Sequence, residues 1–158
     1  MALKPKEPEI VDSIVAVKNE KLLTKHMDFP NNKDYDEYKV YAGYKITTNK
    51  QVISILICDE ADGCESYGII TTDDDLPYYV GAEVVSIVSV DMDYKAHPLF
   101  GMIEPNIDLD DGNELECCFV DMNTSLGKIQ FAIYNCHNGY YGHRVLVKSE
   151  QLSLDTDI

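Results

Sequence analysis

The chain of 158 residues is long enough for one domain with a buried core, and its hydrophobic fraction of 45% is typical of a globular protein. No apolar run reaches the roughly 18 residues of a membrane span, and the N-terminal residues lack the apolar stretch of a secretory signal. The formal net charge of −15 argues against direct binding of nucleic acid, because affinity for phosphate comes from lysine and arginine.

The negative charge is concentrated in the middle of the chain. Residues 51–127 contain 17 acids and one base, Lys95, whereas the remaining residues contain 11 acids and 12 bases. The negative electrostatic field of this region favours a basic protein partner. The alternative is that the acidic surface serves only solubility. The five cysteines follow no repeated spacing, which indicates free thiols in a cytoplasmic setting.

Residues 1–37 are expected to form an extension that is separate from the main domain. Apolar residues recur at helical spacing from Ile10 to about His26, behind a proline and an acid that suit the first turn of a helix. The run Ile14–Val17 is equally compatible with a strand. The sequence Phe29–Asn32 breaks whatever element precedes it.

From residue 38 onward the pattern is that of β-strands. Short apolar runs predict strands at 38–46, 52–58, 66–71 and 83–90. Thr72 resembles a helix N-cap, and Pro77 limits the helix that follows to one or two turns. A hairpin with its turn at 123–127 is predicted over 115–135, followed by a strand at 145–147.

Residues 94–114 form a long acidic connection, and connections of this length are usually functional or mobile. Part of it resembles a calcium-binding loop, but Ile107 and Leu109 stand where oxygen ligands are required, so we expect no calcium site. The elements together predict a β-dominated α+β fold with a mainly antiparallel sheet and one or two short helices. The single β-rich domain spans 38–148, and the polar tail 149–158 is expected to fray.

The segment His137–His143 carries the most distinctive chemistry in the sequence. Asn138 and Gly139 favour a tight turn. Tyr140 and Tyr141 then either lean back on the sheet or form a recognition surface. Arg144, the only arginine, follows this segment and could pair with nearby acids or with an anionic ligand.

Neither zinc binding nor cysteine catalysis is favoured by the residue pattern. His137, His143 and Cys64 lack the close spacing of zinc ligands. The acids that surround Cys64 in the sequence oppose formation of a thiolate, so a nucleophilic Cys64–histidine pair is not expected. We therefore assign no catalytic residue, no metal and no cofactor.

Several short motifs occur in a characteristic order between about Tyr44 and Val147. They are Cys64-Glu65 after an early strand, then Leu76–Gly81 with Val84-Val85, then Thr124–Gly127, and finally Asn138–Tyr141. This order resembles an uncharacterised family of small phage and prophage proteins. The chain departs from that family at Gly63, where the family has the first cysteine of a pair. The family has no agreed activity, so the resemblance implies only a mobile-element protein that acts in the cytoplasm of a bacterial host.

The leading functional hypothesis is a non-enzymatic phage inhibitor of anti-CRISPR or anti-restriction type. It would bind a basic nucleic-acid-handling host protein, and as a DNA mimic it would need carboxylates spaced like phosphates. The predicted partner-binding residues are Asp73, Asp74, Asp75, Asp108, Asp110, Asp111, Asn138, Tyr140, Tyr141 and Arg144. The alternative is a signalling-nucleotide binder, or a Cys/His hydrolase, with its site around Cys64, His137 and His143.

Four residues are predicted to form a polar latch at one end of the sheet: Cys64, Glu65, His137 and His143. The strands at 52–58 and 129–135 both have the apolar character of central strands, and each leads into one of the two polar segments. If the strands have the same sense in one sheet, both segments emerge at the same edge. A buried Glu65 would then need a donor such as His143, Tyr140 or a backbone N–H.

Overall fold

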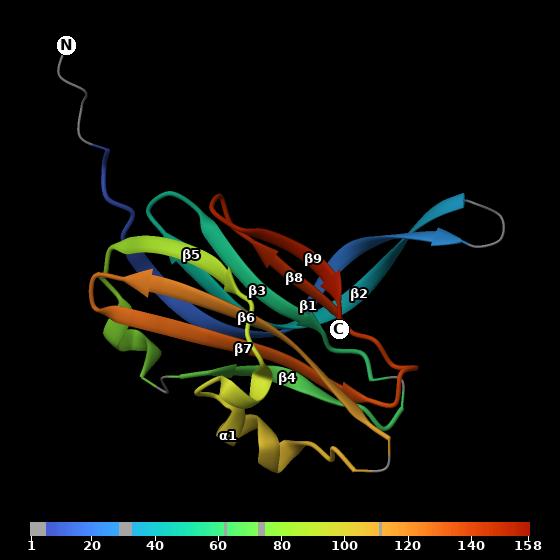
Figure 1. Ribbon diagram of the computed structural model, residues 1–158. Helices are drawn as coiled ribbons and strands as arrows, with labels where there is room; N and C mark the ends of the chain where they lie inside the picture. The colour runs from blue at the N-terminus through green and yellow to red at the C-terminus, as the bar shows by residue number, and fades with distance from the viewer. Residues whose placement is uncertain (1–5, 29–32, 62, 73–74, 111) are drawn as a thin grey trace.

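The computed structural model describes residues 6–28, 33–61, 63–72, 75–110 and 112–158, which fold into two antiparallel β-sheets packed face to face (Figure 1). The first sheet has the order β1-β2-β3-β8-β9, from β1 (Val11–Asp28), β2 (Lys33–Thr48), β3 (Val52–Cys58), β8 (Arg144–Lys148) and β9 (Ser153–Asp157). The second has the order β4-β7-β6-β5, from β4 (Ser66–Thr71), β5 (Val84–Val90), β6 (Glu114–Thr124) and β7 (Gly127–His137).

The helical part of the described chain is small. It consists of one α-helix of four residues and three 3₁₀ turns: η1 (Leu76–Tyr79), η2 (Tyr94–Ala96), α1 (Phe100–Ile103) and η3 (Glu104–Asn106). The prediction of a β-dominated, antiparallel fold is therefore confirmed, although the α+β description gives too much weight to helix. The short helix expected behind Thr72 is η1, and it begins after Asp75 instead.

The main core lies between the two sheets and follows the period-two alternation of their strands. Ile53, Ile55 and Ile57 of β3 point into it from the first sheet, and Ile129 and Phe131 of β7 point into it from the second. Leu56 of β3 and Ala132, Tyr134 and Cys136 of β7 are also buried, on the outer faces of the sheets. Burial on both faces explains why these strands are almost continuously apolar.

The long connection between β5 and β6 covers the outer face of the second sheet. Its buried residues Leu99 and Ile103 pack on Phe119 of β6 and Tyr134 of β7. His97 stacks on Phe119 with ring centroids 4.0 Å apart. The connection (Figure 1) is therefore anchored to the sheet by its apolar residues, while the acids among its described residues are exposed.

The N-terminal extension expected to be helical is instead the edge strand β1 of the first sheet. It pairs with β2 from Val11 to Asp28, and Val11 belongs to the main core at 1% exposure. The helical expectation was wrong because β-branched residues such as Ile14 and Val15 favour a strand when a neighbouring strand is present to pair with them. Beyond the irregularity at Asn19 (φ 58°), β1 and β2 extend past the rest of the sandwich (Figure 1).

The segment before β1 is held by a buried carboxylate rather than by a helical turn. Glu9 accepts hydrogen bonds from Thr48 Oγ1 at 2.9 Å, from Gln51 Nε2 at 2.6 Å and from Gln151 Nε2 at 2.9 Å. Burial by itself raises the pKa of Glu9, but the three hydrogen bonds outweigh it and lower the pKa below its ordinary value. Glu9 thus fastens the N-terminal segment to the β2–β3 and β8–β9 turns, which lie at the same end of the first sheet.

The C-terminal tail, expected to fray, forms the edge strand β9 of the first sheet. β9 pairs with β8, and Ile158 is only 8% exposed within the main core. The backbone N–H of Ile158 donates to His143 O at 2.9 Å, and its backbone O accepts from His143 N at 2.8 Å. In the described residues, no helix has the length and apolarity needed to cross a membrane.

Candidate functional site

A buried contact between Glu65 and His143 links the two sheets. Glu65 directly precedes β4, and His143 directly precedes β8. Nε2 of His143 lies 3.0 Å from Oε1 of Glu65, and the two side chains are 1% and 0% exposed. Nδ1 of His143 lies 2.6 Å from the backbone O of Cys58, at the end of β3. The imidazole therefore ties three separate segments together.

The hydrogen bonds of His143 determine how many protons this pair holds. Because the carbonyl of Cys58 can only accept, Nδ1 of His143 donates to it. Nε2 and Glu65 then share one further proton, either as imidazolium and carboxylate or as imidazole and carboxylic acid. The pair has no net charge in either form, which avoids the cost of an isolated buried charge. Neither nitrogen of His143 is left to act as a general base.

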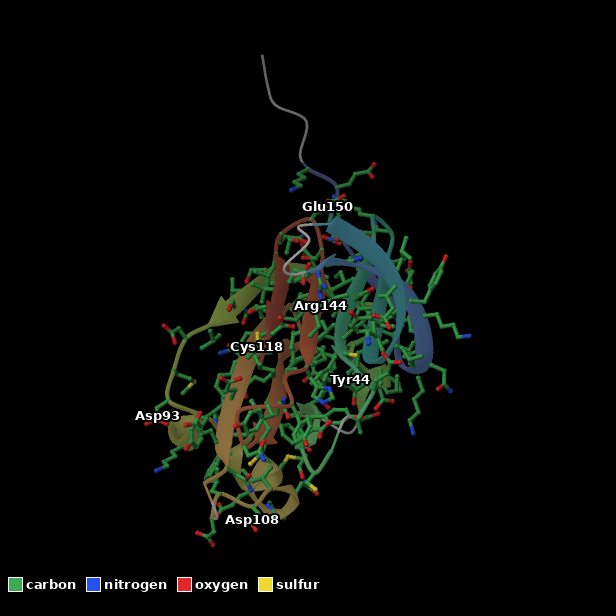
Figure 2. The ribbon with its side chains drawn as sticks, turned by 90° about the vertical axis from the view of Figure 1, so that its right-hand side faces the viewer. Tyr44, Asp93, Asp108, Cys118, Arg144 and Glu150 are labelled. Carbon is green, nitrogen blue, oxygen red and sulfur yellow. The ribbon has the colours of Figure 1, made fainter. Side chains whose placement is uncertain are left out.

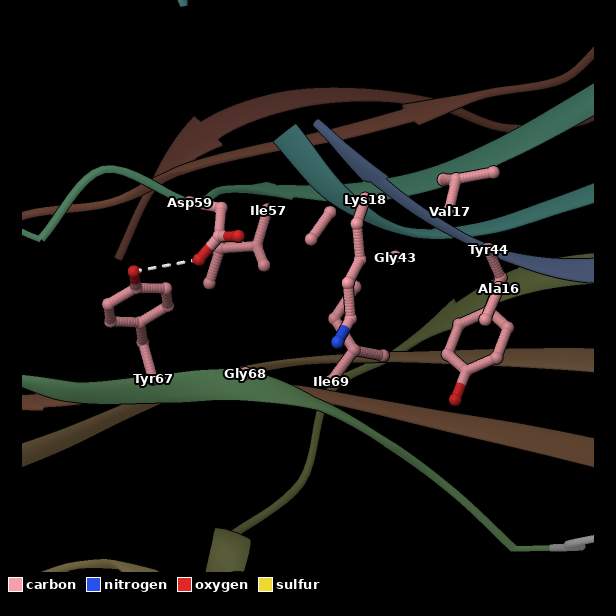
Figure 3. A pocket seen from close by; sticks show the side chains of 11 residues that line it. Ala16, Val17, Lys18, Gly43, Tyr44, Ile57, Asp59, Tyr67, Gly68 and Ile69 are labelled. Carbon is pink, nitrogen blue, oxygen red and sulfur yellow. Dashed lines mark hydrogen bonds between the residues drawn. The ribbon is translucent and has the colours of Figure 1, made fainter. Parts of the chain in front are cut away.

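Tyr67 of β4 covers the His143 imidazole. The two rings stack with centroids 3.8 Å apart and an interplanar angle of 27°. The Tyr67 hydroxyl donates to Oδ1 of Asp59 at 2.9 Å (Figure 3). Burial and then the hydrogen bond to Asp59 raise the pKa of Tyr67 well above its usual value, so the phenol stays protonated at physiological pH.

Tyr141 holds the segment before β4 in place through Gly63. A Cβ atom on residue 63 would lie 2.5 Å from Cζ of Tyr141, so any other residue there would require the ring to shift. The backbone O of Tyr141 in turn accepts from Nδ2 of Asn135 at 2.8 Å, and the same amide donates to Ile158 O at 2.9 Å.

The Asn138-Gly139 turn presents a single tyrosine to solvent. Gly139 has a φ of 98°, the left-handed conformation that Asn-Gly turns favour. The turn does not close a hairpin, because β7 and β8 belong to different sheets. Tyr140 is 85% exposed, whereas Tyr141 is partly buried against Gly63.

The other residues expected in a latch or a ligand site have separate surroundings. Cys64 is exposed. Nε2 of His137 lies 3.3 Å from Oε2 of Glu116 on β6. Arg144 binds Asp155 on β9 through Nε and Nη2, at 2.6 and 2.7 Å, and this hydrogen bonding lowers the pKa of Asp155. These residues therefore do not converge on one ligand site.

The structure thus brings together Glu65 and His143, but not the other two residues of the predicted latch. The strand arrangement that brings them together differs from the expected one, because β3 and β7 lie in different sheets and not in the same sheet. They still end near the same place, since the sheets pack face to face and His143 reaches the end of β3. The stabilising role of the contact stays a prediction.

Three of the acids predicted to bind a partner are exposed in the structure: Asp75, Asp108 and Asp110. Asp73, Asp74 and Asp111 lie outside the described residues. Figure 2 shows Asp93 and Asp108 on the acidic connection, at the periphery of the molecule. The exposed acids of this connection therefore lie on the layer that covers the outer face of the second sheet.

Sequence reasoning missed the residues that surround the Glu65–His143 contact: Asp59, Tyr67, Asn135 and Ile158. Asn135 offered a signal, because it is a polar residue within the apolar run of β7 and is 0% exposed. A polar side chain in such a position needs hydrogen-bond partners, and here the partners are the backbone carbonyls of Tyr141 and Ile158. Nothing local in the sequence distinguishes Tyr67 from other strand tyrosines.

The arrangement offers little support for catalysis. Both nitrogens of His143 are engaged. Burial, the largest effect, raises the pKa of the neighbouring Cys58 thiol, which disfavours the thiolate that a nucleophile requires. Within the described ranges, no three His, Cys, Asp or Glu side chains are grouped to hold a metal ion.

Comparison with known proteins gives a family but no function. A family model described as a domain of unknown function, DUF7448, matches residues 14–147. Comparisons with curated proteins and with solved structures found no match. The matched range begins within β1 and ends within β8, so it covers most of both sheets, including Glu65 and His143.

Proposed function

The chain belongs to the DUF7448 family, which is defined by a domain of unknown function, and we propose that it is a non-enzymatic binding protein whose acidic surface docks on a basic protein. The acidic surface is formed by the β5–β6 connection and the start of β6. The observation that carries the proposal is that, among its described residues, this surface exposes seven acids and one lysine, Lys95. The acids are Asp91, Asp93, Glu104, Asp108, Asp110, Glu114 and Glu116.

The backbone that carries the acidic surface is anchored to the second sheet. Leu99 and Ile103 are 3% and 0% exposed and pack the connection onto the second sheet. Asp93 and Asp108 lie at the outside of this layer (Figure 2). Because the backbone beneath the carboxylates is anchored, a partner would lose little free energy in ordering them.

The carboxylates of the acidic surface are largely available to a partner. Among the described residues, Glu116 is the one member of the set with a basic side chain within ion-pair distance, namely His137. Lysine and arginine of a partner can therefore pair with the other acids without displacing an internal cation. Such complementarity mainly accelerates association and excludes partners of the wrong charge.

The exposed Tyr140 lies beside one end of the acidic surface. In the sheet register His137 pairs with Glu114, and Tyr140 follows three residues later. A tyrosine that is 85% exposed supplies apolar contact area with few rotatable bonds. We include Tyr140 in the docking surface as its apolar contact.

The partner that we propose is a nucleic-acid-handling protein of a bacterial host, such as a CRISPR effector or a restriction enzyme. A groove that binds phosphates is lined by lysine and arginine, and the acidic surface has the complementary charge. The resemblance of the sequence to phage proteins supports the same assignment, with the protein acting as an inhibitor in the host cytoplasm.

The first test is affinity purification from a nuclease-treated bacterial lysate. We expect a basic nucleic-acid-binding protein to be retained at low salt and released as the salt is raised, because exposed charge pairs are screened. Nuclease treatment removes partners that are bridged by nucleic acid. Recovery of no such protein, or of a partner whose binding does not respond to salt, would contradict the proposal.

A further inference from the structure

A cavity of about 200 Å³ lies between the sheets, where β1, β2 and β3 face β4 (Figure 3). It is open because two inward positions of the first sheet carry small side chains. Ala16 pairs with Tyr44 across β1 and β2, and Ala42 is two residues from Tyr44, so all three lie on the same face. Ile57 and Ile69 provide apolar walls from the two sheets.

The cavity carries one positive and one negative side chain that do not neutralise each other. Figure 3 shows Lys18 reaching from β1 into the gap towards Ile69, whereas the Asp59 carboxylate lies beside Tyr67. No carboxylate in the described part of the chain lies within ion-pair distance of Lys18, and no basic group there lies that close to Asp59. Asp59 instead accepts from the Tyr67 hydroxyl.

From this arrangement we propose that the cavity binds a small zwitterion, an α-amino acid with an apolar side chain. The ammonium group lies at Asp59, the carboxylate at Lys18, and the side chain between Ile57 and Ile69, with Tyr44 at the far end of the cavity. The volume is below the roughly 300–1,000 Å³ of sites for drug-sized ligands, which limits the occupant to a small metabolite.

The two opposite charges of the cavity select against ligands that carry a single charge. An anion would meet Asp59 and the field of a protein with a net charge of −15, whereas a cation would meet Lys18. A zwitterion satisfies both groups at once. This site is independent of the proposed function, because its lining residues come from β1, β2, β4 and the end of β3, whereas the acidic surface comes from the β5–β6 connection and the start of β6.

The test uses amide chemical shifts of the ¹⁵N-labelled full chain during titration with L-leucine and with L-phenylalanine. We expect saturable shifts at Ala42–Tyr44 and Tyr67–Ile69, which line the cavity. The analogues 3-methylbutylamine and 4-methylpentanoate, which each lack one charge of leucine, should bind at least about tenfold more weakly. Absence of shifts at these amides with both amino acids up to roughly 20 mM, or equal binding of an analogue, would overturn the proposal.

Substitutions localise the binding. Lys18→Met and Asp59→Asn should each weaken leucine binding by about tenfold or more, and Ala42→Leu should abolish it by filling the cavity. Lys148→Met makes the same change of charge at an exposed position of β8 outside the cavity, and should leave the affinity unchanged. The dispersion of each spectrum reports folding. Unchanged affinity in a folded Lys18→Met variant would contradict the assignment even if Ala42→Leu does not fold.

Discussion

Removal of the Glu65 carboxylate should destabilise the protein far more than removal of an exposed partner of histidine. In Glu65→Ala, the His143 imidazole would stay buried and bound to Cys58 O through Nδ1, but Nε2 would lose the oxygen that lies 3.0 Å away. A buried polar group without a partner costs roughly 1–3 kcal/mol, and breaking a buried ion pair costs roughly 3–5 kcal/mol. The Glu65–His143 pair is neutral as a whole and lies between these two cases. We therefore expect Glu65→Ala to lower the free energy of unfolding by about 3 kcal/mol, the value at which the two ranges meet.

Urea unfolding and thermal melting followed by circular dichroism measure this effect. For a chain of this length each kcal/mol corresponds to roughly 2–4 °C, so Glu65→Ala should lower Tm by roughly 6–12 °C. Glu65→Gln keeps a donor for Nε2 and should cost less than about 1 kcal/mol. The control is Glu116→Ala, since Glu116 also contacts a histidine but is 49% exposed, and it should cost no more than about 1 kcal/mol. A cost for Glu65→Ala no greater than that of the control would refute the reasoning.

Three further predictions address the termini and the tyrosine contact. The carboxylate of Glu9, whose pKa is lowered on folding, stabilises the protein above its unfolded-state pKa of roughly 4.3, and this contribution is lost as the pH falls through the folded-state value. The urea midpoints of the wild type and Glu9→Gln should therefore converge in acid, and a difference that persists would be inconsistent with this. Gly63→Ala should cost roughly 1–3 kcal/mol through its clash with Tyr141, and an unchanged Tm would exclude that contact. Deletion of Ile158 should cost about 2–4 kcal/mol, and hydrogen exchange should show lost protection of the His143 amide; retained protection would contradict the pairing.

The strands of the sandwich were largely predictable because their apolar patterns are local. The segment 52–58 coincides with β3, and the hairpin predicted over 115–135 is β6 and β7 with each strand extended. The N-terminal stripe from Ile10 to His26 misled because its apolar residues fit a helical period as well as a strand with an irregularity at Asn19. The polar residues of β9 gave no local signal, because its order comes from pairing with β8 and from the burial of Ile158.

The candidate site was predictable only in part, since its contacts join segments that are distant in sequence. Glu65 and His143 are 78 residues apart, and which histidine Glu65 would meet depends on how strands are divided between the two sheets. His137, which directly precedes Asn138 in sequence, ends β7 and contacts Glu116 on the neighbouring strand. The charge imbalance was visible from composition, but only the fold shows that the acidic connection is anchored on one layer.

The most direct test of the proposed function measures affinity for the purified basic partner, by calorimetry, with two variants that have the same net charge. The first neutralises part of the acidic surface with Glu104→Gln, Asp108→Asn, Asp110→Asn and Glu114→Gln. The second neutralises four exposed acids elsewhere with Glu7→Gln, Asp12→Asn, Glu83→Gln and Glu150→Gln. We expect the first variant to bind at least about tenfold more weakly than the wild type, about 1.4 kcal/mol, and the second to bind within roughly threefold of it. Equal losses would mean that net charge alone acts, and unchanged affinity in the first variant would show that the acidic surface is not the binding site.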